Sequence, residues 1–153
     1  MRFRYKELFA AVGTVHPHTM FRHDDRLCWT DHVMVELPPK GKTLPVGVRG
    51  GVLRPHIANR IELVLDFLTS PPYPYEECHT ETVEQRRTMD VAVFRSDSYV
   101  MSVQLVYYRY FRHRYPGCSF FIRRTSTGMV QVRDSDSIVG YIKGLMDFGL
   151  SNG

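Results

Sequence analysis

Apolar and polar side chains alternate most regularly in residues 99–107. One parity of this stretch is apolar throughout: Tyr99, Met101, Val103, Leu105 and Tyr107. Successive side chains of a β-strand point to opposite faces, so a period of two predicts a half-buried strand. Residues 89–94 predict a preceding strand, and residues 95–98 the hairpin turn between the two. Pro116 and Gly117 end the long strand, and residues 118–123 and 128–133 predict two more, which makes an antiparallel meander over about 89–133.

Apolar positions three or four residues apart predict a helix near each end of the sequence. Residues 4–12 predict a short N-terminal helix that Gly13 ends. An amphipathic C-terminal helix over 138–148 would be capped by Asp134 or Ser135 at its start and by Gly149 at its end. Its apolar positions are Ile138, Tyr141, Ile142, Leu145, Met146 and Phe148.

Together these elements predict an α+β fold, with a mainly antiparallel sheet in one compact domain that covers residues 1–153. Residues 33–37 predict a further strand, and residues 44–53 an edge or bulged strand interrupted by proline and glycine. Residues 57–68 fit a helix and a strand about equally, and we leave both open. The proline-rich residues 70–75 predict a stiff, extended linker.

Gly140 and Gly144 lie four residues apart in the predicted C-terminal helix. Each glycine costs about 1 kcal/mol of helix propensity relative to alanine. Close approach of another backbone would offset that cost. We therefore predict an oligomer interface at Gly140, Tyr141, Gly144 and Leu145.

The composition indicates a folded, modestly basic protein. Hydrophobic residues make up 43% of the chain, and the formal net charge is +4, with arginine more frequent than lysine. Arginine contacts phosphate in a planar, two-pronged way, which favours acidic partners. The three cysteines are widely spaced, so we expect an intracellular, reducing compartment. We expect no signal peptide and no membrane-spanning segment, and any contact with anionic membrane would be peripheral.

Residues 107–115 break the alternation, because aromatic and basic side chains now occupy odd-numbered and even-numbered positions alike. One interpretation is a strand that leaves the core with its arginine stems lying over apolar rings. The other is a nucleic-acid surface on which rings stack with unpaired bases and arginines neutralise phosphates. The predicted nucleic-acid-binding residues are Tyr107, Tyr108, Arg109, Tyr110, Arg112 and Arg114, and Arg123 and Arg124 would extend the surface.

No motif points to catalysis or to a cofactor. His16, His18, Cys28 and His32 are weak candidates for zinc ligands, because the spacing of Cys28 and His32 suits two ligands but that of the other histidines matches no zinc module. The sequence contains no GxSxG, HExxH or phosphate-binding GxxxxGK[ST] motif. We therefore expect a protein that is not an enzyme and that carries no cofactor.

Two functions remain open. The first is a basic protein that binds nucleic acid, RNA more than DNA, through its arginine and aromatic side chains. The second is a self-assembling structural or adaptor protein. In general character, such a protein is similar to the small basic matrix proteins of negative-strand RNA viruses, which implies a sheet-rich homo-oligomer that associates with anionic membrane and RNA.

Overall fold

The computed structural model describes residues 19–30, 33–44, 74–123, 129–145 and 149–150. The chain divides into two compact units, residues 1–72 and residues 73–153. The boundary falls within the proline-rich segment that the sequence identified as a stiff linker. The single domain expected from chain length stays a prediction.

The described part of the first unit is a small antiparallel sheet. It contains β1 (Thr19–His23), β2 (Arg26–Thr30) and β3 (Met34–Glu36) in the order β1-β2-β3. Asp24 and Asp25 form the two-residue turn between β1 and β2, with φ values of 53° and 59°. Positive φ at both central positions matches the right-handed twist of the flanking strands. The strand predicted at residues 33–37 is confirmed as β3.

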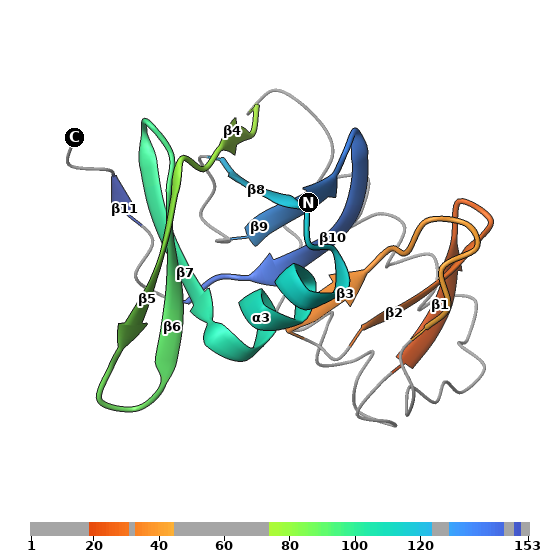
Figure 1. The fold of residues 1–153 in the computed structure, drawn as a ribbon, viewed down its shortest axis with the longest axis horizontal. Helices are drawn as coiled ribbons and strands as arrows, with labels where there is room; N and C mark the ends of the chain where they lie inside the picture. Colours follow the sequence, from red (N-terminus) through yellow and green to blue (C-terminus); the bar gives the residue numbers. More distant parts are fainter. Residues whose placement is uncertain (1–18, 31–32, 45–73, 124–128, 146–148, 151–153) are drawn as a thin grey trace, which may run out of the picture. The chain divides into compact units, whose positions relative to one another are not determined.

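The described part of the second unit consists of two antiparallel sheets and a helix (Figure 1). One sheet has the order β10-β9-β8-β4 and the other the order β11-β7-β6-β5. The strands are β4 (Glu76–Glu77), β5 (Thr80–Gln85), β6 (Asp90–Arg95), β7 (Tyr99–Gln104), β8 (Ser119–Ile122), β9 (Met129–Asp134), β10 (Ser137–Lys143) and β11 (Gly149–Leu150), and the helix is α3 (Leu105–Arg114).

Main-chain hydrogen bonds connect the two sheets at both edges. At one edge, β4 pairs with β8 and β5 with β6, and the amide of Cys78 donates to the carbonyl of Phe120 at 2.8 Å. At the other edge, the amide of Leu145 donates to the carbonyl of Ser102 at 2.8 Å, and β11 pairs with β7. The chain passes from one sheet to the other at both places. Main-chain hydrogen bonds therefore continue from one sheet to the other at both places, while β5 remains an edge strand of its own sheet.

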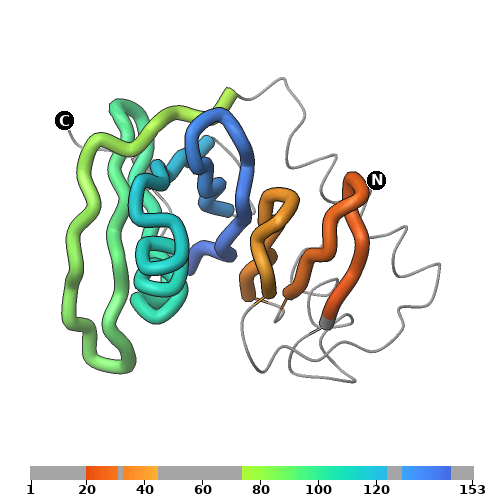
Figure 2. The backbone as a smooth tube through the Cα atoms, turned by 45° about the vertical axis from the view of Figure 1, so that its right-hand side comes forward, coloured from red at the N-terminus to blue at the C-terminus, as the bar shows by residue number. Residues whose placement is uncertain are grey.

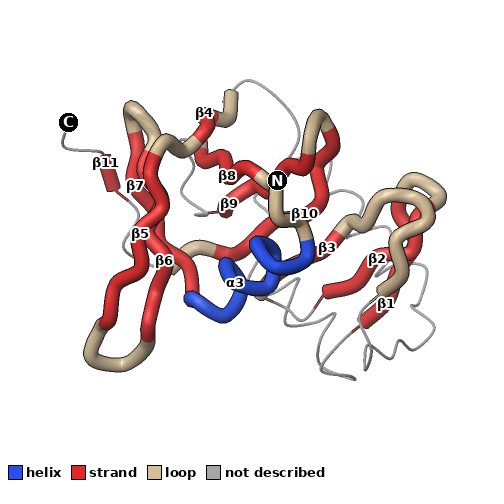
Figure 3. The backbone as a smooth tube through the Cα atoms, in the orientation of Figure 1, coloured by secondary structure: helices blue, strands red, loops and turns tan. Residues whose placement is uncertain are grey.

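Helix α3 packs against β6 and β7, beside which it lies in Figures 2 and 3. Leu105 and Phe111 are its buried residues. The rings of Phe94 on β6 and Phe120 on β8 meet at 4.7 Å, and that of Tyr108 on α3 lies 5.7 Å from Phe94. These three rings fill the space between the two sheets, so the helix contributes to the same core as the strands.

The prediction that one long strand continues to about residue 115 is wrong. β7 ends at Gln104, and α3 follows it directly. Leu105, Tyr108, Phe111 and Tyr115 recur every three or four residues, which is a helical period. Packing this stripe on the core outweighs the strand preference of aromatic residues. Pro116 then prevents the helix from continuing.

The predicted meander over 89–133 is correct only in part. The hairpin β6–β7 and the antiparallel pair β8–β9 are confirmed. However, β7 and β8 belong to different sheets, and α3 connects them. The sheet-rich fold is thus confirmed, with α3 the single helix of the described residues.

The predicted C-terminal helix is wrong, since its first half is β10 and Gly149 begins β11. Four consecutive residues of β10, from Val139 to Ile142, are buried. A strand that is buried on both faces has apolar side chains at successive positions and no alternation with polar ones. Such a continuous apolar run also fits the spacing of a helix. Ser135 does not cap a helix but lies in the β9–β10 turn with φ 53°. The predicted N-terminal helix and the segments 45–53 and 57–68 lie outside the described residues.

Candidate nucleic-acid interface

The solvent side of α3 is basic and has no acidic residue. Val106, Arg109 and His113 are exposed and lie three or four residues apart, which places them on one face of the helix. Among the residues that the structure describes, Arg109 makes no ion pair or hydrogen bond through its side chain. An exposed guanidinium in this state is free to contact an external anion.

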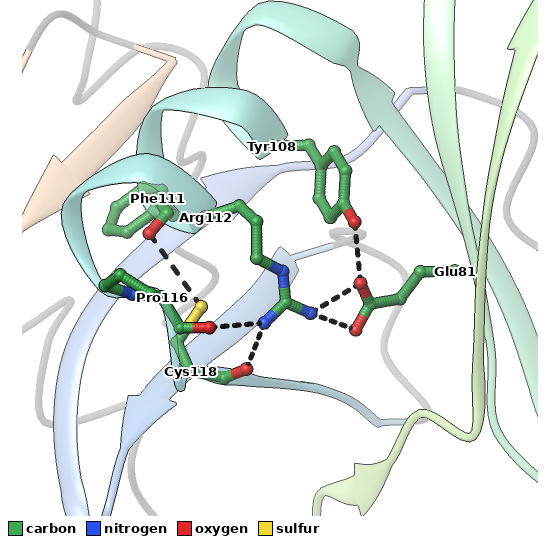
Figure 4. Close-up of polar contacts among 6 residues, drawn as sticks. All are labelled: Glu81, Tyr108, Phe111, Arg112, Pro116 and Cys118. Carbon is green, nitrogen blue, oxygen red and sulfur yellow. Dashed lines mark hydrogen bonds and ion pairs between the residues drawn. The ribbon is translucent and has the colours of Figure 1, made fainter.

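The opposite side of α3 is fixed by Arg112 (Figure 4). Its Nη2 donates to both carboxylate oxygens of Glu81 on β5, each at 2.6 Å. Its Nη1 donates to the carbonyl of Cys118 at 2.7 Å, and the hydroxyl of Tyr108 donates to Glu81 at 2.7 Å. The guanidinium carbon also lies 5.1 Å from the centre of the Phe120 ring. Arg112 therefore connects the helix to β5 and to the start of β8.

The pKa values of Arg112, Tyr108 and two nearby thiols lie above their ordinary values. Burial lowers the pKa of Arg112, but hydrogen bonds with Glu81 and Tyr108 raise it by more, so the net pKa lies above its ordinary value. Burial and the hydrogen bond to Glu81 raise the pKa of Tyr108. Burial raises the pKa of Cys118 to about 11 and that of Cys78 to about 12. Both thiols are thus protonated at neutral pH, and a protonated thiol is a poor nucleophile.

A second arginine and aromatic cluster lies on the other face of β8. Phe120 points toward α3, so the alternation of the strand turns Phe121 and Arg123 the opposite way. The guanidinium carbon of Arg133 lies 3.9 Å from the centre of the Phe121 ring. That of Arg123 lies 4.6 Å from the ring of Tyr75. Sequence reasoning missed Arg133, Phe121 and Tyr75, although the parity of residues 119–123 is the signal that separates the two faces.

The structure divides the predicted nucleic-acid residues into groups with different surroundings. Arg109 is exposed, Tyr107 and Tyr110 are half-buried, and Tyr108 and Arg112 belong to the Glu81 network. The guanidinium carbon of Arg114 lies 5.9 Å from the ring of Tyr115. Arg123 is 4% exposed and faces away from α3, and Arg124 lies outside the described residues. The described members of the set do not form one continuous patch, because six of them lie on α3 and Arg123 follows β8 and faces away from the helix.

The residues predicted as an oligomer interface do not share a helix face. Gly140 lies at a register shift in β10, and Tyr141 is fully buried, with its hydroxyl accepting a hydrogen bond from Gln131 at 3.0 Å. Gly144 and Leu145 follow the end of the strand. The prediction rested on two glycines on one face of a helix, and this part of the chain is a strand instead.

Of the weak candidates for zinc ligands, only Cys28 can be placed. It is fully buried in β2, whereas His16, His18 and His32 lie outside the described residues. Within the described ranges, no group of three or more metal-binding side chains comes together. No helix of those ranges has the length and apolar character required to cross a bilayer.

No protein-family model, curated protein or solved structure matches this chain. Its function must therefore be inferred from the geometry of its own residues.

Proposed function

We propose that this chain is a non-enzymatic basic protein that binds nucleic acid, RNA in preference to DNA. The observation that carries the proposal is the solvent side of α3. Arg109 is exposed there, has no carboxylate partner in the described chain, and lies one turn before exposed His113. A guanidinium held on a helix that lacks acidic residues is suited to phosphate.

The network behind the helix supports the proposal by fixing the direction in which Arg109 points. Arg112 is held by Glu81 and by the carbonyl of Cys118, so the helix cannot roll without breaking these bonds. A preorganised contact loses less conformational entropy on binding than a mobile one. We assign Arg112 and Tyr108 to positioning the helix, and Arg109 to contact with phosphate.

The preference for RNA rests on the aromatic side chains near the helix. Tyr107 and Tyr110 are half-buried, so part of each ring reaches solvent. Sequence-selective RNA binding mostly uses unpaired bases, which stack on such rings. Duplex DNA keeps its bases stacked inside the helix and offers chiefly phosphates.

The test is fluorescence anisotropy of a labelled single-stranded RNA across a salt series, with a DNA of the same sequence beside it. We expect affinity to fall steeply with salt, because binding releases counterions. We expect Arg109→Gln to bind RNA more weakly and with a shallower salt slope. Arg22→Gln is the matched control, since Arg22 is an exposed arginine on β1 in the other unit. Equal losses in the two variants would exclude α3 as a specific surface, and no binding at low salt would exclude the function.

We propose self-assembly as a second candidate because of strand β5. It is an edge strand of its sheet, and all of its residues except Glu81 are exposed. Val83 on this edge is 54% exposed. An unpaired edge is a template for pairing with a second copy. Light scattering at increasing concentration tests this, and a wild-type protein that stays monomeric contradicts it.

A further inference from the structure

The face of the β8–β9–β10 sheet that carries Phe121 holds a second cluster of arginine and aromatic side chains. Phe121 on β8 lies opposite Gln131 on β9, and Gln131 lies opposite Tyr141 on β10. Arg133 follows Gln131 by two residues, so it occupies the same face. These four side chains form a row across three strands, which we call the sheet-face cluster.

The guanidinium of Arg133 is held from two directions. Its Nε donates to Gln131 Oε1 at 2.6 Å, and Gln131 Nε2 donates to the Tyr141 hydroxyl at 3.0 Å. Gln131 is 1% exposed and Tyr141 is fully buried, so this chain of hydrogen bonds is anchored in the interior. The ring of Phe121 supports the guanidinium at 3.9 Å from its centre. Few alternative rotamers remain open to Arg133 under these constraints.

The rest of the Arg133 guanidinium is available to a ligand. The side chain is half-buried, and its two Nη atoms have no hydrogen-bond or ion partner in the described chain. Its charge lies 5.9 Å from the ring of Tyr75, which also faces Arg123 at 4.6 Å. The guanidinium groups of Arg123 and Arg133 thus both lie near the ring of Tyr75. Glu77, opposite Phe121 on β4, forms no ion pair within the described ranges.

We propose that the sheet-face cluster is a stacking subsite for one unpaired base of a single-stranded nucleic acid, an inference that rests on the function proposed above. The base stacks on the guanidinium plane of Arg133, on the side away from Phe121. The flanking phosphate accepts hydrogen bonds from the Nη atoms. Guanidinium planes and aromatic rings are the groups on which proteins stack unpaired bases. The ordered support from Phe121 and Gln131 distinguishes this arginine from the exposed arginines elsewhere in the chain.

Arg133→Lys is the decisive variant, because it keeps the charge and removes the plane. The probe is a short single-stranded RNA that contains one 2-aminopurine, a base whose fluorescence is quenched by stacking. We expect wild-type protein to quench it at saturation. We expect Arg133→Lys to lose most of the quenching and about tenfold in affinity, while its salt slope stays unchanged. Glu77→Gln should bind more tightly, since it removes a negative charge beside the site.

The outcomes separate this inference from the proposed function. If RNA binds the wild-type protein and Arg133→Lys quenches the probe equally well, the stacking subsite is overturned. The proposal of RNA binding would then remain intact. Complete competition by inorganic phosphate at constant ionic strength would overturn it too, because phosphate offers no ring to stack. No RNA binding at all would overturn both proposals. Arg22→Gln controls for the loss of one positive charge. Thermal unfolding of every variant controls for misfolding, and each variant must unfold at the same temperature as the wild type.

Discussion

Arg112 on α3 and Glu81 on β5 lie 31 residues apart in the sequence and meet in an ion pair in which one Nη contacts both carboxylate oxygens at 2.6 Å. The same guanidinium reaches the carbonyl of Cys118, so one side chain connects the helix, an edge strand and the loop that starts β8. An arginine that the sequence predicts in a binding surface is thus held by a carboxylate and a carbonyl of its own chain. Its neighbours Arg109 and His113 remain on the solvent side.

The first prediction concerns the strength of this connection. Glu81→Ala should lower the free energy of unfolding by about 1–2 kcal/mol, because it leaves the partly buried Arg112 without its carboxylate. The value is modest since the two side chains are 22% and 34% exposed and water screens the pair. Urea unfolding measures it. Glu84→Ala, which removes an exposed carboxylate 3.5 Å from Arg86, is the control and should change stability by less than about 0.5 kcal/mol. Equal effects would contradict the structural role of Glu81.

The second prediction is a loss of stability at alkaline pH. The pKa of Cys118 is raised from 9.0 to about 11, chiefly by burial. Between these values the unfolded thiol ionises and the folded one does not, so unfolding releases a proton and stability falls as pH rises from 9 to 11. The full loss from Cys118 would be roughly 2–3 kcal/mol. Urea unfolding at several pH values should show a shallower decline for Cys118→Ala than for wild type. Parallel curves would contradict the assignment.

The third prediction separates helix stability from RNA binding. Val106 is 64% exposed, and the first turn of α3 contains no acidic residue. Val106→Glu should stabilise the protein by about 0.3–1 kcal/mol through the helix dipole. The same change should weaken RNA binding, because it places a negative charge one turn before Arg109. Thermal unfolding and anisotropy measure the two effects, and Val106→Gln is the neutral control. Affinity unchanged by the added charge would argue against α3 as the interface.

The fourth prediction concerns the β1–β2 turn. Asp25 has φ 59°, a conformation that glycine adopts without strain. Asp25→Gly should stabilise the hairpin by about 0.5–1 kcal/mol. The lost contact with Lys40, at 3.7 Å and highly exposed, contributes little. Trp29, the single tryptophan of the chain, lies on β2, so its fluorescence during urea unfolding reports on this unit. A destabilised variant would contradict the proposed strain.

The sequence predicted five of the eleven described strands from their alternation. The hairpin of β6 and β7, the strands β8 and β9, and the short β3 all carry the pattern that the fold uses. The errors at β10 and α3 have an identifiable physical cause. In β10 both faces are covered, so Tyr141 and Ile142 fit helical and strand periods equally. In α3, Tyr108 and Arg112 are oriented by Glu81, a partner that no local pattern identifies.

The sequence also could not predict how the arginines divide between surfaces. Residues 120 and 121 are both phenylalanine, yet one faces α3 and the other supports Arg133. That division depends on which face of β8 the helix covers, which is a property of tertiary packing. Composition drew attention to the arginine and aromatic residues, but their grouping required the strand register.

The pairing of β11 with β7 has a consequence for the timing of folding during synthesis. This pairing joins Gly149 and Leu150 to Val100 and Tyr99, about 50 residues earlier in the sequence. β6 can pair with one side of β7 as soon as both strands have left the ribosome. The other side of β7 stays unpaired until β11 follows. Pairing between such distant residues is slow, and an open edge attracts other nascent chains. The second unit therefore completes its strand pairing only after residues 149 and 150 have left the ribosome.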